Sequence, residues 1–343
     1  MQTDNLRISQ THPLISPAVL TEELPLTEAA SELVTRARND VRAILRGEDQ
    51  RLLAVVGPCS IHDTAAAEEY AGRLAGVAAE VSGQILCVMR VYFEKPRTVV
   101  GWKGLINDPD LDGSYRINRG LRLARQVLLA VNDAGLPAGT EFLDTTFGQY
   151  YTDLVSWGAI GARTVESQIH RELASGLSMP VGLKNRTDGD VQVAVDAIRA
   201  AAHKHLFPSL TKEGAPAILE TTGNPDCHLV LRGGSAPNYD RDSLRAAQAL
   251  LAGAGLPEIV MVDCSHANSG RDPTRQPLVA KDVVAQRTGG NGGIRGIMIE
   301  SHLSGGRQDM GGHLRYGVSI TDACLGFEDT RTLLHELAGR LSG

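Results

Sequence analysis

Short apolar segments recur along the chain and alternate with longer amphipathic ones. Most of the short segments are rich in Val, Ile and Leu, which is typical of parallel strands buried on both faces. Eight such segments are present, at 52–57, 85–91, 137–142, 159–164, 180–184, 228–232, 259–263 and 294–299. The amphipathic segments between them predict helices, for example at 64–80, 118–134, 149–157, 189–203, 241–253 and 322–341.

Eight successive strand–helix units predict an α/β fold of the closed (β/α)8 type, a TIM barrel, rather than an open doubly wound sheet. No GxGxxG motif follows the first strand, which argues against a dinucleotide-binding domain. We therefore interpret residues 49–343 as one catalytic barrel.

Two segments fall outside the eight units. Residues 1–48 form an N-terminal extension with a charged amphipathic helix at about 27–46. Residues 205–222 contain two β-like runs around Lys-Glu-Gly-Ala-Pro, which predicts a β-hairpin inserted before the sixth strand. We expect both additions to serve subunit contacts or regulation.

Composition and charge narrow the function classes. The 343 residues carry a net charge of −6, which argues against a nucleic-acid or membrane-surface partner. No apolar run reaches the roughly 20 residues that span a bilayer, and the N-terminus does not resemble a signal peptide. The five cysteines show no CxxC spacing, so we expect a reducing compartment, the cytoplasm.

Reactive or charged residues lie at the carboxyl end of every predicted strand. These ends share one rim in a barrel, and that rim holds the active site. In chain order the residues are Cys59, Arg90, Glu141, Arg163, Lys184, Arg232, His266 and Glu300. A barrel selected only for stability would not need such groups at each position.

Four of the rim residues form a mixed sulfur, nitrogen and oxygen set. Cys59, His266, Glu300 and Asp322, the last from the loop after the final strand, suit a divalent transition metal. Only their shared rim position supports this hypothesis, because their sequence separations are large. Taken singly, Cys59 could be a core residue, His266 a hydrogen-bonded loop histidine and Asp322 a helix cap.

The other rim residues are mainly cations. Six of them converge on the same mouth, namely Arg90, Lys95, Arg97, Arg163, Lys184 and Arg232. Guanidinium groups suit phosphate and carboxylate oxygens, and lysine supplies a point charge. The set predicts a substrate with several negative charges, and Glu141 would balance part of the positive charge.

At these residues the chain resembles the type I 3-deoxy-D-arabino-heptulosonate 7-phosphate (DAHP) synthases of enterobacteria and yeasts. The matching stretches are GPCSIHD (57–63), MRVYFEKPRTVVGWKGLINDP (89–109), GAIGARTVESQIHRELASGLSMPVGLKN (158–185), LRGG (231–234), VDCSHANS (262–269), IMIESHL (297–303) and YGVSITDACLGFEDT (316–330). They are distributed over nearly the whole chain.

The resemblance implies the first step of the shikimate pathway. C3 of phosphoenolpyruvate adds to the aldehyde of erythrose 4-phosphate, water attacks C2, and phosphate leaves. It implies one divalent metal per subunit (Mn, Fe, Co or Zn) on Cys59, His266, Glu300 and Asp322. Phosphoenolpyruvate would be held by Arg90, Arg163, Lys184 and Arg232, and erythrose 4-phosphate by Lys95, Arg97 and Thr98. Glu141 belongs to the same substrate site. Lys184 is also a candidate for proton transfer.

The resemblance also implies a homodimer or homotetramer with a feedback pocket for an aromatic amino acid. The matching positions are Asp4, Asn5, Gln149, Ser178, Phe207 and Ser209. Ser209 favours phenylalanine over tyrosine as the inhibitor, and an insensitive enzyme remains an alternative. Three residues depart from the pattern. Arg186 replaces a glycine, Phe327 a tryptophan, and Gly148 a proline.

Three other functions fit parts of the pattern. A Schiff-base aldolase would use Lys184 as its nucleophile. A 3-deoxy-octulosonate 8-phosphate synthase would perform the same chemistry on another aldose phosphate. A non-catalytic regulator would bind only the aromatic amino acid. The metal set and the KPRT stretch favour the DAHP synthase interpretation.

Overall fold

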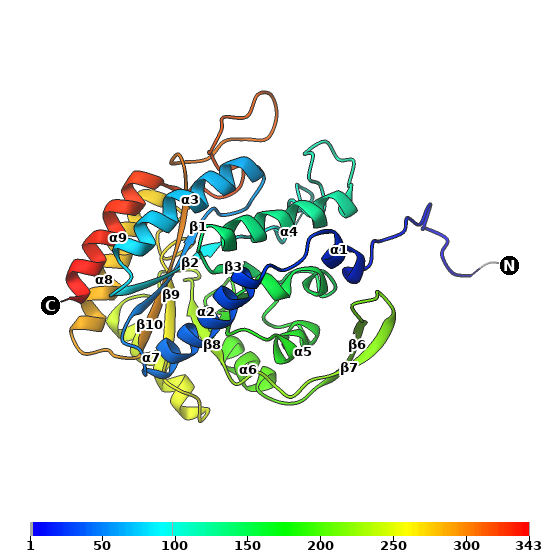
Figure 1. Cartoon of the computed structure of the whole chain (residues 1–343). Coiled ribbons are helices and arrows are strands. Elements are labelled where there is room, and N and C mark those ends of the chain that lie inside the picture. The colour runs from blue at the N-terminus through cyan, green and yellow to red at the C-terminus, as the bar shows by residue number, and fades with distance from the viewer. Residues whose placement is uncertain (1–2, 98, 343) are drawn as a thin grey trace.

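The computed structural model describes residues 3–97 and 99–342 and shows a closed parallel barrel (Figure 1). Its strands pair in the order β1-β2-β3-β4-β5-β8-β9-β10, and β10 pairs back with β1. The barrel strands are β1 (Leu52–Gly57), β2 (Ile85–Arg90), β3 (Ala138–Glu141), β4 (Trp157–Ile160), β5 (Val181–Lys184), β8 (Cys227–Leu231), β9 (Val260–Asp263) and β10 (Ile294–His302). The predicted TIM barrel is confirmed, and each of its strands overlaps a predicted one.

Helices surround the barrel and connect its strands (Figure 1). They are α1 (Pro17–Glu23), α2 (Glu28–Arg46), α3 (Thr64–Glu80), α4 (Ile117–Asp133), α5 (Gln168–Gly176), α6 (Gln192–Ala201), α7 (Arg241–Gly253), α8 (Gln276–Thr288) and α9 (Phe327–Leu341). The 3₁₀ turns in the described residues are η1 (Phe147–Tyr150), η2 (Thr152–Leu154) and η3 (Pro273–Arg275). Across the described residues, every helix is too short or too polar to cross a membrane.

The strands are buried on both faces, which is why they read as continuous apolar runs. In β1, Leu52, Ala54 and Val56 pack outward in the core shared with the helices. Leu53 and Val55 point into a second core inside the barrel. Because side chains alternate along a strand, both faces must be apolar here.

Helix α2 closes the amino-terminal end of the barrel. Its residues Val41, Ile44 and Leu45 belong to the interior core. Arg42 and Arg46 pair with Asp226, just before β8, at 2.7 and 3.0 Å. The opposite, carboxyl end of the barrel is left open for a site.

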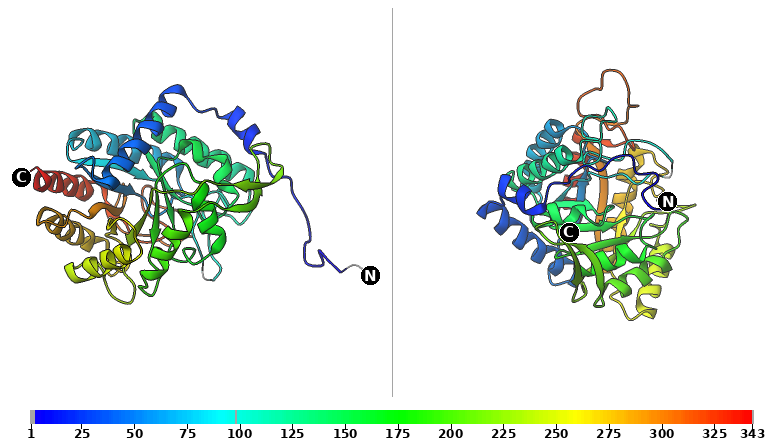
Figure 2. Two further views of the ribbon diagram at one scale, coloured as in Figure 1. Left: turned by 90° about the horizontal axis from the view of Figure 1, so that it is seen from below. Right: turned by 90° about the vertical axis from the view of Figure 1, so that its right-hand side faces the viewer.

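The hairpin insert is confirmed, as β6 (Leu206–Leu210) paired antiparallel with β7 (Pro216–Glu220). It lies beside α1, where the Ala18 amide donates to the Lys212 carbonyl at 2.6 Å. Figure 2 shows the arm before α1 projecting away from the barrel on the same side.

Two helix predictions were wrong in part. Residues 149–157 form η1 and η2 and the start of β4, because their amides bond three residues back, as from Leu154 to Tyr151. The buried Arg125 fixes this path by donating to the Tyr150 carbonyl and pairing with Asp153 at 2.8 Å. The final helix begins at Phe327 rather than 322, since β11 (Leu325–Gly326) pairs with β10 first.

Candidate active site

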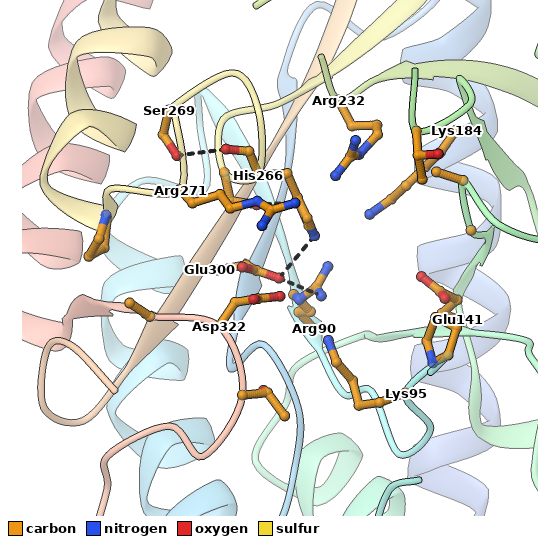
Figure 3. Close-up of a pocket in the computed structure, with 18 of the residues that line it drawn as sticks. Arg90, Lys95, Glu141, Lys184, Arg232, His266, Ser269, Arg271, Glu300 and Asp322 are labelled. Atoms are coloured by element: carbon orange, nitrogen blue, oxygen red, sulfur yellow. Dashed lines mark hydrogen bonds and ion pairs between the residues drawn. The ribbon is translucent and has the colours of Figure 1, made fainter. Parts of the chain in front are cut away.

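A cavity of about 540 Å³ lies at the carboxyl end of the barrel (Figure 3). The structure brings ten of the predicted site residues to its lining. They are Arg90, Lys95, Arg97, Glu141, Arg163, Lys184, Arg232, His266, Glu300 and Asp322. Cys59 lies fully buried beside them, and Thr98 lies outside the described residues. The shared rim therefore exists, as expected from the barrel geometry.

Three of the predicted metal ligands lie together. Ligand atoms of Cys59, Glu300 and Asp322 all lie within 4.8 Å of one another. His266 stands beside this group, with Nε2 3.8 Å from Glu300 Oε1. Its φ of 53° lies in the left-handed region. This conformation is uncommon for residues other than glycine, and such residues cluster at functional sites. One sulfur, one nitrogen and two carboxylates fit a divalent transition metal.

The thiol of Cys59 is protonated at neutral pH in this arrangement. Burial raises its pKa to about 11, with a further contribution from Glu300 that Lys95 partly offsets. Lys95 Nζ lies 3.0 Å from Cys59 Sγ. A metal that binds the thiolate would therefore have to displace a proton.

Arg90 fixes the side chain of Glu300. Its Nη2 lies 2.9 Å from Glu300 Oε1, and both side chains are at most 2% exposed. The guanidinium carbon also lies 3.6 Å from the centre of the Tyr92 ring. Burial alone would lower the pKa of Arg90, but its neighbours, with Tyr92 and Glu300 first among them, together raise the pKa. Arg90 thus links a metal-ligand candidate to the cation cluster.

The remaining cations surround open space. Lys184 and Arg232 are buried and Arg163 is exposed, and all three face the cavity (Figure 3 labels the first two). Burial lowers the pKa of Arg232, and so do Arg163 and Arg271. Cations that disfavour one another's charge are stabilised by an anionic ligand.

Sequence reasoning missed three residues of this site. Arg271 and Arg307 line the cavity from the loops after β9 and β10. Asp263, the last residue of β9, lies under the cavity and is fully buried. Burial would raise the pKa of Asp263, but His266 and Lys184 hold the pKa well below its usual range. A buried acid at a strand end was the signal that could have identified Asp263.

The predicted feedback residues are only partly brought together in one chain. The hairpin that carries Phe207 and Ser209 contacts η1, since Lys212 Nζ donates to the Gln149 carbonyl at 2.5 Å. Ser178 is exposed, and its carbonyl accepts from Arg42. Asp4 and Asn5 lie exposed on the arm before α1.

The residues that depart from the family pattern have local roles. Arg186 pairs with Glu166 at 2.6 Å and with Asp188. It is absent from the described lining of the cavity, so it adds no cation to the mouth. Phe327 is buried against Tyr70, with ring centroids 5.4 Å apart, which fits the apolar slot expected for it.

Known proteins of one family match this chain over nearly its full length. Residues 23–335 match the DAHP synthetase I family. The Phe-sensitive phospho-2-dehydro-3-deoxyheptonate aldolase of Escherichia coli (strain K12) is 56% identical over 339 residues, 98% of this chain and 97% of that protein. The Trp-sensitive E. coli enzyme is 53% identical with the same coverage.

A solved structure agrees as well. The phospho-2-dehydro-3-deoxyheptonate aldolase of Francisella tularensis SCHU S4 superposes with a TM-score of 0.96 at 50% identity, and 98% of each chain is covered. The match includes the arm, the hairpin and the barrel, because so little of either chain is left out. The chain belongs to the DAHP synthetase I family.

Proposed function

We propose that this chain condenses phosphoenolpyruvate with erythrose 4-phosphate and water to give DAHP and phosphate, the first step of aromatic biosynthesis. The observation that carries this proposal is the cation-rich cavity directly beside a sulfur and carboxylate group. Two phosphorylated substrates need several cations, and the group beside them suits a metal.

Cys59, His266, Glu300 and Asp322 would hold one divalent metal, whose identity is left open among Mn, Fe, Co and Zn. When bound, the metal supplies a Lewis acid that polarises the aldehyde of erythrose 4-phosphate. Glu300 is already held in place by Arg90, at 2.9 Å. The ligand set is therefore ordered in part before a metal arrives.

The cations orient the substrates. Arg163, Lys184 and Arg232 would bind the phosphate and carboxylate of phosphoenolpyruvate, with Glu141 balancing their charge. On the side of β2, Lys95, Arg97 and Thr98 would bind erythrose 4-phosphate. Holding both substrates in one cavity aligns the reacting carbons and removes much of the entropic barrier of a two-substrate reaction.

The loss of phosphoenolpyruvate absorbance with erythrose 4-phosphate tests the reaction. We expect turnover that disappears with chelator and returns with manganese. Turnover that persists after verified metal removal would contradict the metal site. Preference for a five-carbon aldose phosphate would favour an octulosonate-type synthase. Borohydride trapping that is insensitive to chelator would favour a Schiff base on Lys184.

A matched pair of arginines tests the residue assignment. Arg163 is exposed and Arg186 is half-buried, and the two lie in neighbouring loops, but of the two only Arg163 lines the cavity in the described structure. Arg163→Ala is expected to raise KM for phosphoenolpyruvate at least tenfold, because a charge-assisted hydrogen bond contributes about 1.5–3 kcal/mol. Arg186→Ala is expected to leave KM within about twofold. Equal effects would refute the assignment.

Regulation and assembly extend the proposal. The E. coli relatives are named Phe-sensitive and Trp-sensitive. We place an aromatic amino acid between the hairpin, η1 and the arm of a second copy of the chain, in a homodimer or homotetramer. Size-exclusion chromatography with light scattering tests the assembly, and inhibition by each aromatic amino acid tests the effector. Five free, buried cysteines are in keeping with a cytoplasmic location.

A further inference from the structure

One buried carboxylate touches both halves of the site. Asp263 Oδ2 lies 2.9 Å from His266 Nδ1 and 3.0 Å from Lys184 Nζ. Its other oxygen, Oδ1, accepts from the Ser265 amide at 3.0 Å and from the Ser265 hydroxyl at 2.6 Å. The side chain is fully buried, so no solvent competes for these four donors.

The hydrogen bonds determine which nitrogen of His266 carries the proton. An ionised carboxylate can only accept, so the Ser265 hydroxyl must donate its one proton to Asp263. Ser265 Oγ also lies 2.7 Å from His266 Nδ1 and has no second proton to give. Both neighbours of Nδ1 are therefore acceptors, and Nδ1 must be the protonated nitrogen.

The other nitrogen of the ring is consequently free to bind a metal. In a neutral imidazole with Nδ1 protonated, Nε2 carries the lone pair. It is Nε2 that faces Glu300, at 3.8 Å, on the side of Asp322 (Figure 3). Ligand atoms of Glu300, Asp322 and Cys59 lie within 4.8 Å of one another. Carboxylates that hold a histidine in this way strengthen metal binding in other proteins.

We propose that Asp263 is a positioning residue for the metal centre: it holds His266 in the tautomer that offers Nε2 to the metal, partly through Ser265. The same oxygen anchors the Lys184 ammonium, so one side chain positions a metal ligand and a substrate cation. This inference rests on the proposed function, since it requires His266 to be a ligand.

Asp263→Asn tests the inference with a nearly isosteric change. An asparagine has one acceptor oxygen for the four donors, and its amide can donate to Ser265 Oγ. The Ser265 proton can then turn toward Nδ1, and Nε2 becomes the protonated nitrogen. We expect the dissociation constant for Mn²⁺ alone, from competition with a chelating indicator, to rise by about 10–100-fold.

Asp226→Asn is the matched control. Asp226 also pairs with two cationic side chains, Arg42 and Arg46, but at the opposite end of the barrel. This variant is expected to bind Mn²⁺ as the wild type does, even where it melts at a lower temperature. At saturating Mn²⁺, Asp263→Asn is also expected to raise KM for phosphoenolpyruvate and leave KM for erythrose 4-phosphate unchanged, because Lys184 loses its anchor.

Two outcomes would overturn the inference. The first is a folded Asp263→Asn variant whose Mn²⁺ dissociation constant stays within about threefold of the wild-type value, against the expected 10–100-fold. Should that variant not fold, the metal-free wild-type protein decides, because ¹⁵N NMR of labelled histidine reports which ring nitrogen of His266 carries the proton. A neutral His266 protonated at Nε2 is the second. Wild-type protein that binds no Mn²⁺ would instead refute the proposed function.

Discussion

A buried histidine inside the barrel makes stability depend on pH. His228 is 1% exposed, and its Nε2 accepts a hydrogen bond from Trp157 Nε1 at 3.2 Å. Burial lowers the pKa of His228 to about 4, although Asp226 raises it slightly. The usual pKa of histidine in an unfolded chain is about 6.5. Protonation of His228 Nε2 would point its new N–H at the indole N–H of Trp157 and break this hydrogen bond.

The sign and size of the effect follow from these two values. Between pH 6.5 and 4 the unfolded chain binds a proton that the folded chain excludes, so stability falls as the pH is lowered through this window. Moving from pH 7 to pH 5 is expected to cost about 2 kcal/mol of the free energy of unfolding. For 343 residues this corresponds to a drop in melting temperature of about 3 °C.

His228→Gln isolates the contribution of this residue. The glutamine oxygen can accept from Trp157 Nε1 but does not titrate. His302, whose pKa is also lowered to about 4 by burial, remains in both proteins and cancels in the comparison. The assay is thermal unfolding at pH 7 and pH 5, with chelator present and at one protein concentration, because metal and subunit binding also change with pH.

We expect the drop in melting temperature between the two pH values to be about 3 °C smaller in His228→Gln than in the wild type. A lower melting temperature of the variant at pH 7 would not affect the reasoning, since only the difference between the two pH values is compared. Equal drops in both proteins would refute it, and would mean that His228 is protonated in the folded barrel.

Three further predictions concern metal choice, loop packing and the arm. Cys59→Ser is expected to weaken the binding of Zn²⁺ more than the binding of Mn²⁺, because a hydroxyl is a harder ligand than a thiolate. Competition with a chelating indicator, carried out with each metal, checks this. Gly234→Ala would place Cβ 2.3 Å from the backbone of Gly189, so we expect destabilisation by about 1–3 kcal/mol in urea unfolding and a higher KM for phosphoenolpyruvate. Removing residues 1–12 is expected to keep turnover and abolish inhibition by an aromatic amino acid, as measured by the phosphoenolpyruvate assay.

Most of the fold could be predicted because each strand of a closed barrel is buried on both faces. Residues 52–57 read as a strand, and β1 has those bounds. The helix predicted at 149–157 failed because tertiary contacts override local preference there. Arg125, which is distant in sequence, donates to the Tyr150 carbonyl and pairs with Asp153, and these contacts fix the path of the backbone around Tyr150. A contact of that kind leaves no periodic signal in the segment it shapes.

The site was predictable to the extent that strand ends determine position. His266 lies three residues after the end of β9, and Glu300 lies in the last part of β10. The place of Arg271 could not be predicted in this way, because it depends on how the loop after His266 returns to the cavity. That return uses left-handed conformations at Arg271 and Gly270, with φ of 63° and 64°. Arg307 belongs to a still longer loop, whose path the sequence pattern does not specify.

The proposed metal ligands and the proposed substrate cations are interleaved rather than separate, and this has a consequence for the protein without metal. Arg90 pairs with Glu300 at 2.9 Å, and Lys95 lies 3.0 Å from Cys59 Sγ. Glu300 and Asp322 beside an ionised Cys59 would repel one another and destabilise the fold if nothing balanced their charges. Here cations balance the carboxylates, and the thiol keeps its proton because burial raises its pKa to about 11. We therefore expect chelated protein to stay folded and lose only its turnover, and thermal unfolding with and without chelator checks this.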